Sequence, residues 1–318
     1  MLTCSQLQSI ITGAVWVREI DGWLVPSRFS DLQNERLKTD WKAPYLPTAA
    51  GMKLEFTTTE GGAVSFAYHA VRGSVYDCFG VELAINGTTV HHIYSDVLPE
   101  SGAFFYEIPP QEKAARITVY LPNVATIRMK DVSIPADFVP YRRSKKILCL
   151  GDSITQGAWT RYPRNSYVNR LGDALEAEVL NQGICGDYFS ESRLDEALPF
   201  VPDLITVAYG TNDWGGGGLL TDAPKKYLDK LVSLYGDTPV FLLLPIWRHD
   251  EETEYHGQTL EEGRRILAEL AASYDSVRAI DCHFFVPPEE RYFWDKKLHP
   301  NDDGFLLYAQ ALLKEILS

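Results

Sequence analysis

The spacing of hydrophobic residues changes near residue 140, and this change constrains the fold more than any other feature of the chain. From about residue 22 to residue 134, short stretches alternate apolar and polar residues, and turn signals such as Gly61-Gly62 and Pro109-Pro110 separate them. A period of two is typical of antiparallel strands with one buried face. We therefore predict an antiparallel β-sandwich, with a tight hairpin at Asn86-Gly87 because both residue types accept the positive φ of a type I′ turn.

Beyond the stretch 135–146, apolar runs alternate with helical patterns. The runs cover residues 146–150, 203–210, 239–246 and 277–282, and the helical patterns cover residues 167–178, 223–236, 259–274 and 302–318. Repeated strand-helix units indicate a parallel sheet with helices on both faces. The expected organisation is a β-sandwich accessory domain at 1–140 followed by an α/β domain at 141–318.

Charge and composition narrow the classes of partner. The 318 residues include 30 basic and 43 acidic side chains, so the formal charge is 30 − 43 = −13. This balance disfavours broad binding to nucleic acid or to anionic lipid. No apolar run approaches the length of a membrane span, and the N-terminus lacks the pattern of a signal peptide, so we expect a cytoplasmic protein.

The sequence contains no pattern that predicts a metal or an organic cofactor. The five cysteines are scattered without a CxxC spacing, which indicates reduced thiols. His249 and His256 stand among acidic residues without a recognisable ligand spacing, so a solvated loop is the simpler interpretation.

The stretch Gly-Asp-Ser-Ile-Thr at 151–155 directly follows the first strand of the α/β half. Ligands and catalytic groups in such sheets gather beyond the carboxyl ends of the strands. Ser153 could be a nucleophile there, or Asp152 or Ser153 could merely cap the next helix. The G-x-S-x-G elbow is absent because Thr155 occupies its last position, which argues against an α/β-hydrolase.

Three other stretches at strand ends supply what an isolated hydroxyl lacks. A serine needs a base, and the tetrahedral intermediate needs hydrogen-bond donors aimed at its oxyanion. Gly186 in "NQGICGD" could present a backbone N–H, Asn212 in "GTND" could present its amide, and His299 in "LHPND" could be the base.

In this order and placement, the four stretches resemble the sequence blocks of the SGNH (GDSL-type) hydrolases over about residues 145–318. The resemblance implies a flavodoxin-like three-layer α/β/α domain. It also implies that Ser153 is the nucleophile, that His299 is the general base, and that Gly186, Asn212 and the Ser153 N–H form the oxyanion hole. The preceding jelly-roll-like sandwich resembles the accessory module of some carbohydrate esterases of this superfamily.

One position departs from the family pattern. The orienting aspartate usually lies three residues before the histidine, where this chain has Lys296. Asp295 lies four residues before His299, and a helical turn would bring the two together. The alternative is a Ser-His dyad in which a backbone carbonyl orients the imidazole.

These features predict a serine esterase without metal or cofactor. Small acyl esters, in particular acetyl esters of carbohydrates, are the expected substrates, and Trp159, Trp214 and Trp247 could contact them, although core packing would explain these aromatic residues equally well. An acyl-CoA or lysophospholipid hydrolase of the same superfamily and a non-catalytic carbohydrate-binding protein are the alternatives.

Overall fold

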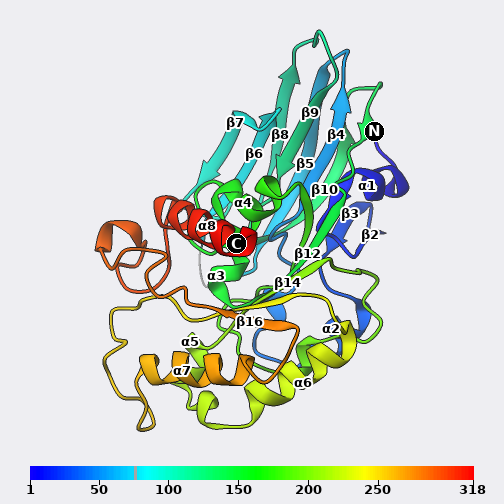
Figure 1. Ribbon diagram of the computed structural model, residues 1–318. Coiled ribbons are helices and arrows are strands. Elements are labelled where there is room, and N and C mark those ends of the chain that lie inside the picture. The colour runs from blue at the N-terminus through cyan, green and yellow to red at the C-terminus, as the bar shows by residue number, and fades with distance from the viewer. Residues whose placement is uncertain (75–76) are drawn as a thin grey trace.

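The N-terminal half is a sandwich of two antiparallel sheets in a computed structural model, which describes residues 1–74 and 77–318 (Figure 1). One sheet has the order β1-β4-β9-β6-β7, with β11 also paired to β4, and the other has the order β2-β3-β10-β5-β8. The predicted β-sandwich is therefore confirmed. The strands are β1 (Ile11–Thr12), β2 (Trp16–Ile20), β3 (Trp23–Ser27), β4 (Lys53–Thr58), β5 (Gly62–Arg72), β6 (Phe79–Ile85), β7 (Thr88–Ser95), β8 (Ser101–Ile108), β9 (Ala115–Tyr120), β10 (Ala125–Ser133) and β11 (Val139–Pro140).

The alternation of side chains places the sandwich core. Along β5, the buried residues are every second one, Val64, Phe66, Tyr68 and Ala70, and the residues between them are partly exposed. Asn86 has a φ of 49° and Gly87 a φ of 80°, and Ile85 pairs with Thr88 across them. The predicted two-residue hairpin is thus confirmed.

The C-terminal half is a five-stranded parallel sheet in the order β13-β12-β14-β15-β16, with helices on both faces. In β12, Leu148 and Leu150 face the cluster that contains α6 and α7, whereas Ile147 and Cys149 face the cluster that contains α4 and α8. Figure 1 shows α4 and α8 on the side of the sheet nearer the sandwich and α6 and α7 on the opposite side. This arrangement is the three-layer α/β/α architecture that the sequence predicts.

The elements of this half are β12 (Lys145–Gly151), α3 (Ser153–Gln156), η2 (Pro163–Asn165), α4 (Tyr167–Ala174), β13 (Ala177–Asn181), η3 (Glu191–Arg193), β14 (Leu204–Ala208), α5 (Thr211–Gly215), η4 (Gly218–Leu220), α6 (Ala223–Tyr235), β15 (Val240–Leu243), α7 (Leu260–Ala271), β16 (Val277–Ile280), η5 (Glu290–Tyr292) and α8 (Asp302–Leu317). The helix predicted at 167–178 ends earlier, because Glu176 adopts a φ of 50° and the chain then enters β13. No helix within the described ranges combines the length and apolar character needed to cross a bilayer.

Residues 28–46, between β3 and β4, leave the sandwich and pack on the α/β half. They contain α2 (Asp31–Leu37) and η1 (Ala43–Tyr45), while α1 (Cys4–Ile10) lies beside β2. The buried Arg28 guanidinium donates to the carbonyls of Asn181 and Gly183 at 2.8 and 2.6 Å. Strand pairing changes from antiparallel at β11 to parallel at β12, between Pro140 and Lys145. The hydrogen bonds of Arg28 nevertheless join residues that lie on the two sides of this boundary in the sequence.

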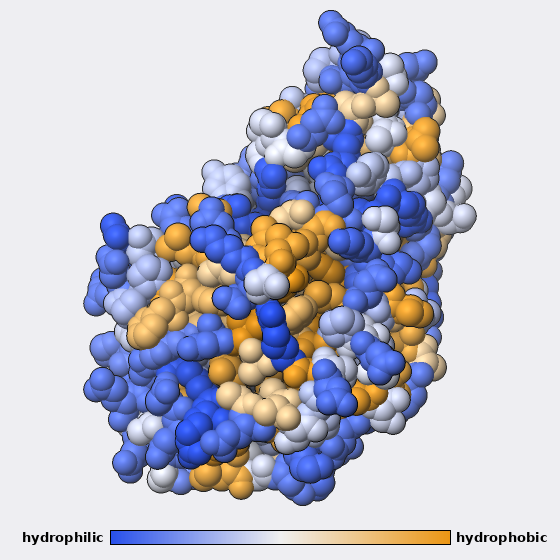
Figure 2. Space-filling view, in the orientation of Figure 1, coloured by the Kyte–Doolittle hydropathy of each residue, from blue (hydrophilic) through white to orange (hydrophobic). Residues whose placement is uncertain are grey.

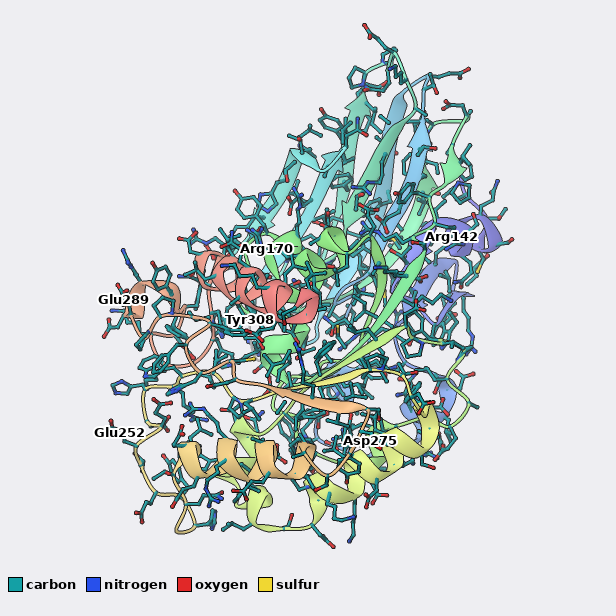
Figure 3. The ribbon with its side chains drawn as sticks, viewed as in Figure 1. Arg142, Arg170, Glu252, Asp275, Glu289 and Tyr308 are labelled. Carbon is teal, nitrogen blue, oxygen red and sulfur yellow. The ribbon has the colours of Figure 1, made fainter. Side chains whose placement is uncertain are left out.

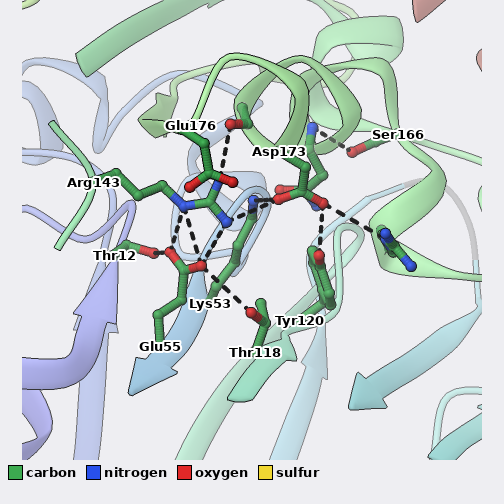
Figure 4. A network of polar contacts seen from close by, with 12 residues as sticks. Thr12, Lys53, Glu55, Thr118, Tyr120, Arg143, Ser166, Asp173 and Glu176 are labelled. Atoms are coloured by element: carbon green, nitrogen blue, oxygen red, sulfur yellow. Dashed lines mark hydrogen bonds and ion pairs between the residues drawn. The ribbon is translucent and has the colours of Figure 1, made fainter. Parts of the chain in front are cut away.

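A buried ionic network makes a second connection between the halves (Figure 4). The Arg143 guanidinium lies 2.6 Å from Glu55 of β4 and 3.0 Å from Asp173 of α4, and Lys53 Nζ lies 2.9 Å from Asp173. Burial alone would raise the pKa of Asp173, but Lys53 and Arg143 lower it to about 2. Figure 2 shows that the widest hydrophobic stretch on this face lies over the α/β half next to the sandwich, while the far tip of the sandwich is hydrophilic.

Candidate active site

Ser153 is the first residue of α3, immediately beyond the carboxyl end of β12. Asp152, not Ser153, caps this short helix, because its Oδ1 accepts the Ile154 N–H at 2.9 Å. Gly157, with a φ of 85°, ends the helix after one turn. The Ser153 side chain therefore does not cap the helix and can make other contacts.

The Ser153 hydroxyl, the His299 imidazole and the Asp295 carboxylate form one continuous hydrogen-bonded line. Ser153 Oγ lies 2.9 Å from His299 Nε2, and His299 Nδ1 lies 2.7 Å from Asp295 Oδ2. These distances meet the requirement that a base contact its nucleophile and that a third group orient the base. The contact between Asp295 and His299 that the sequence analysis left open is thus present.

Asp295 reaches the imidazole through a turn and not through a helix, which corrects the expected geometry. Its Oδ1 accepts the N–H groups of Lys297, Leu298 and His299 at 3.0, 2.9 and 3.1 Å. Lys296 adopts a φ of 60°, so the additional residue between aspartate and histidine is absorbed in a left-handed position. Partial burial would raise the pKa of Asp295, but the hydrogen bonds from His299 and the backbone N–H groups hold it well below its usual range.

Potential oxyanion donors come from three strand-end loops. Within the described parts of the chain, the Ser153 and Gly186 N–H groups have no intramolecular hydrogen-bond acceptor. Gly186 has a φ of 74°, a conformation that favours glycine. Asn212, in α5 after β14, donates one amide hydrogen to the Asp187 carbonyl at 2.8 Å, which fixes the side chain and leaves its second hydrogen available.

Two buried carboxyl groups lie next to the residues of the site. Asp152 is 2% exposed, and this burial raises its pKa to about 7 despite the hydrogen bond from Ile154. Burial likewise raises the pKa of Asp213 to about 6. Asp213 accepts the N–H groups of Phe189 and Gly210, both at 3.0 Å, and so joins the loop after β13 to the loop after β14.

The three tryptophans predicted near the site lie in different environments. Trp214 is completely buried and donates its Nε1–H to the Gln258 carbonyl at 2.8 Å, so of the two interpretations left open for this residue the structure favours core packing. Trp247 is partly buried and packs on Phe293, with the ring centroids 5.0 Å apart. Trp159 lies beside the triad, with its ring centroid 6.3 Å from that of His299.

Trp159 and Trp294 form a stacked pair that the sequence analysis identified only in part. Their ring centroids are 5.4 Å apart with an interplanar angle of 21°. Trp159 adopts a φ of 71°, a strained conformation for a bulky residue, and such strain concentrates at functional sites. Trp294 was missed although it directly precedes Asp295, because no helical or strand period marks its position.

Two pockets are lined by residues that neighbour the proposed catalytic groups. One of about 50 Å³ is lined by Trp159, Thr160 and Trp294 together with sandwich residues that include Tyr94 and Asp96. The other, about 290 Å³, is lined by Asn212, Tyr188, Phe189 and residues of the following glycine-rich turn. Figure 3 shows Glu252 and Glu289, on the loops after β15 and β16, extending at the same edge of the molecule.

Similar solved structures share the whole two-part fold. The salicylyl-acyltransferase SsfX3 from a tetracycline biosynthetic pathway superposes with a TM-score of 0.83 at 20% identity, covering 96% of this chain and 93% of that chain. A protein of Bacteroides ovatus described as a GDSL-like lipase gives 0.72 at 16% identity, covering 98% and 95%. A family two carbohydrate esterase from Clostridium thermocellum, in complex with cellohexaose, gives 0.57 at 15% identity, covering 83% and 90%.

At these identities the likeness establishes the fold alone. A search of curated proteins found no match. The GDSL-like lipase/acylhydrolase family matches residues 149–307, a range that begins before the nucleophile loop and ends within α8. With Ser153, Gly186, Asn212 and His299 all inside that range, the chain belongs to the GDSL-like lipase/acylhydrolase family.

Proposed function

We propose that the protein is a serine esterase in which Ser153 is the nucleophile, His299 the general acid-base and Asp295 the group that orients His299. The alignment of Ser153 Oγ, His299 and Asp295 at 2.9 and 2.7 Å, beside donors from three loops, carries the proposal. Such an arrangement lowers the barrier both to proton transfer and to charge development on the carbonyl oxygen.

The reaction proceeds in two steps, acylation of Ser153 and hydrolysis of the acyl-enzyme. The Ser153 proton moves to His299 Nε2 as Oγ bonds to the ester carbon, and the carbonyl electron pair moves onto the oxygen in the hole. Collapse breaks the bond to the alcohol oxygen, which takes the proton from Nε2. Water then gives a proton to Nε2, attacks the acyl carbon and breaks its bond to Oγ, and Ser153 recovers the proton.

The position of His299 supports a proposal for how the two sides of the substrate lie. Nε2 must reach both Ser153 Oγ and the leaving oxygen, so the alcohol part lies on the His299 side, where Trp159 and Trp294 stack. The pocket there also contains Asp77 and Asp96 from the sandwich. Aromatic faces with carboxylate acceptors suit the carbon rings and hydroxyl groups of a sugar, which supports an acetylated carbohydrate as substrate.

A second candidate concerns the acyl group. The pocket beside Asn212 has a volume of about 290 Å³, more than an acetyl group occupies, and the fold is shared with an enzyme named for salicylyl transfer. These observations favour a larger acyl group. An acyl-CoA or lysophospholipid hydrolase would use the same triad and the same larger pocket.

One set of assays separates these possibilities. Wild type and Ser153→Ala should be compared on p-nitrophenyl esters of increasing acyl length and on peracetylated sugars. We expect the variant to lose activity by at least about 10³-fold, as removal of a triad member does. Equal background rates in both proteins would leave only a carbohydrate-binding role, and rates that rise with acyl length would exclude an acetyl preference.

A further inference from the structure

Four charged side chains form a compact cluster next to Gly186 of the proposed oxyanion hole. They belong to Asp40, Lys42, Asp187 and Arg193. Arg193 binds the Asp187 carboxylate through two nitrogens, Nε at 2.8 Å and Nη2 at 2.7 Å, and its Nη2 lies 3.1 Å from Asp40 Oδ2. Lys42 Nζ lies 3.4 Å from Asp187 Oδ1 and 3.8 Å from Asp40 Oδ1. The side chains of Lys42 and Asp187 are 1% and 0% exposed, so two positive and two negative charges balance almost out of water.

The cluster contacts the oxyanion hole through the backbone of Asp187. This residue directly follows Gly186, and its carbonyl accepts the Asn212 amide at 2.8 Å. Clamping the Asp187 carboxylate therefore restricts the short backbone segment from Gly186 to Asp187, which carries the Gly186 N–H at one end and, at the other, the Asp187 carbonyl that orients Asn212. Oxyanion stabilisation depends on donors that are fixed before the reaction.

Trp41 contacts Gly186 from the solvent side. Its Cη2 atom is 2.8 Å from the point where a Cβ atom on Gly186 would stand, although 63% of the residue is exposed. The neighbouring Lys42 ammonium lies 3.9 Å from the centroid of the Tyr188 ring, and Tyr188 lines the pocket beside Asn212. Trp41, although largely exposed, therefore packs against Gly186, whose N–H is a proposed oxyanion donor.

We propose that residues 40–42, which come from the N-terminal half of the chain, are a working part of the active site. Asp40 and Lys42 are positioning residues that hold Asp187, and through it Gly186 and Asn212, in the geometry that stabilises the oxyanion. Trp41 limits the access of water to the hole and borders the acyl side. The inference rests on the proposed esterase function and assigns part of that function to the segment between α2 and η1.

A buried lysine elsewhere provides a matched control. Lys53 is 3% exposed and pairs with Asp173 at 2.9 Å in the network of Figure 4, which also joins the two halves. Lys42→Met and Lys53→Met each remove one buried charge between the halves and should lower stability to a similar extent. Of these two variants, only Lys42→Met should shift the oxyanion donors of Gly186 and Asn212.

The readouts are kcat, KM and the inhibition constant of phenylboronic acid, whose tetrahedral adduct with a serine hydroxyl places an oxygen in the hole. Because outright loss of an oxyanion donor costs about 10²–10³ in kcat, misalignment by Lys42→Met should cost about 10–50-fold, with KM changed less than about twofold. The inhibition constant of phenylboronic acid should rise by a similar factor, because the variant binds the inhibitor less tightly. In Lys53→Met all three quantities should stay within about twofold of wild type.

Trp41→Ala tests the proposal independently of stability, because this exposed side chain is not needed for the core. It should lower kcat by about 3–10-fold, and Trp41→Phe should recover most of the loss. The proposal is overturned if folded Lys42→Met and Trp41→Ala both keep wild-type kcat and boronate affinity, or if Lys53→Met loses as much kcat as Lys42→Met. Should Lys42→Met not fold, Asp40→Asn, at a partly exposed position, takes its place under the same criteria. Failure of the esterase function itself is distinguishable, because wild type would then share the rate of Ser153→Ala.

Discussion

Replacing Asp295 with asparagine probes the element of the site where this chain departs most from its family. The asparagine Oδ1 can still accept the three backbone N–H groups of Lys297, Leu298 and His299, so the turn should persist. The amide NH₂ then faces His299 Nδ1 in place of a carboxylate oxygen. This contact favours the tautomer with hydrogen on Nε2, which cannot accept the Ser153 proton.

The magnitude follows from the charge removed. During attack His299 becomes positive, and opposite unit charges about 4 Å apart attract by about 4 kcal/mol at an effective dielectric constant of about 20. Because 1.36 kcal/mol corresponds to a tenfold change in rate, that energy equals about 10³ in kcat. The Asp295 side chain is 27% exposed, which weakens the attraction, so we expect a loss of about 10²–10³-fold.

The assay is steady-state hydrolysis of p-nitrophenyl acetate by wild type, Asp295→Asn and Ser153→Ala, with Asp303→Asn as a control. Asp303 is an exposed acid in the first turn of α8 and should tolerate the change. A loss of less than about threefold in folded Asp295→Asn would refute the reasoning and would support a Ser-His dyad, since a tautomer-fixing carboxylate contributes far more than that.

Two further predictions concern the surroundings of the triad. The Asp152→Asn variant should become more stable than the wild type as the pH rises. The pKa of Asp152 in the folded protein is about 7, above the ordinary value of 3.8, so the wild type loses stability as the pH rises from the lower value to the higher one. The variant has no carboxyl group at this position and keeps its stability over that range. We expect its Tm to exceed that of wild type by about 3–8 °C at pH 8 and by much less at pH 5, measured by calorimetry; a constant difference would contradict the burial argument. Trp294→Ala should lower kcat/KM for a peracetylated sugar by about tenfold more than for p-nitrophenyl acetate, because the stacked pair contacts the alcohol part; equal losses on both substrates would show that Trp294 only supports the loop.

The parts of the site that could be predicted are those fixed by topology. Ser153, Gly186 and Asn212 each follow a parallel strand, and the order β13-β12-β14 makes those strands neighbours, so their ends must meet. His299 precedes α8, which packs on α4 of the same half. Pattern and position along the chain were enough to place these four residues at one end of the sheet, whereas their roles in catalysis stay predictions.

Other features depend on local angles or on distant contacts that a period does not encode. The contact of Asp295 with His299 was expected through a helical turn, whereas the left-handed Lys296 produces it through a different turn. Trp214 lies in a five-residue helix, too short for a pattern to reveal that its ring faces the core. The ion pair of Asp40 with Arg193 joins residues 153 positions apart, so nothing near "DWK" at 40–42 indicates a contact with this distant part of the chain.

The most direct test of the account is whether Ser153 carries the acyl group during turnover. Wild-type protein mixed with p-nitrophenyl acetate and quenched in acid within the first turnover should gain the mass of one acetyl group, and peptide mass spectrometry should place it on the peptide that contains Ser153. Ser153→Ala should gain none, and His299→Ala should gain it far more slowly. An acetyl group found on another residue, or hydrolysis by wild type that is no faster than by Ser153→Ala, would contradict the central claim.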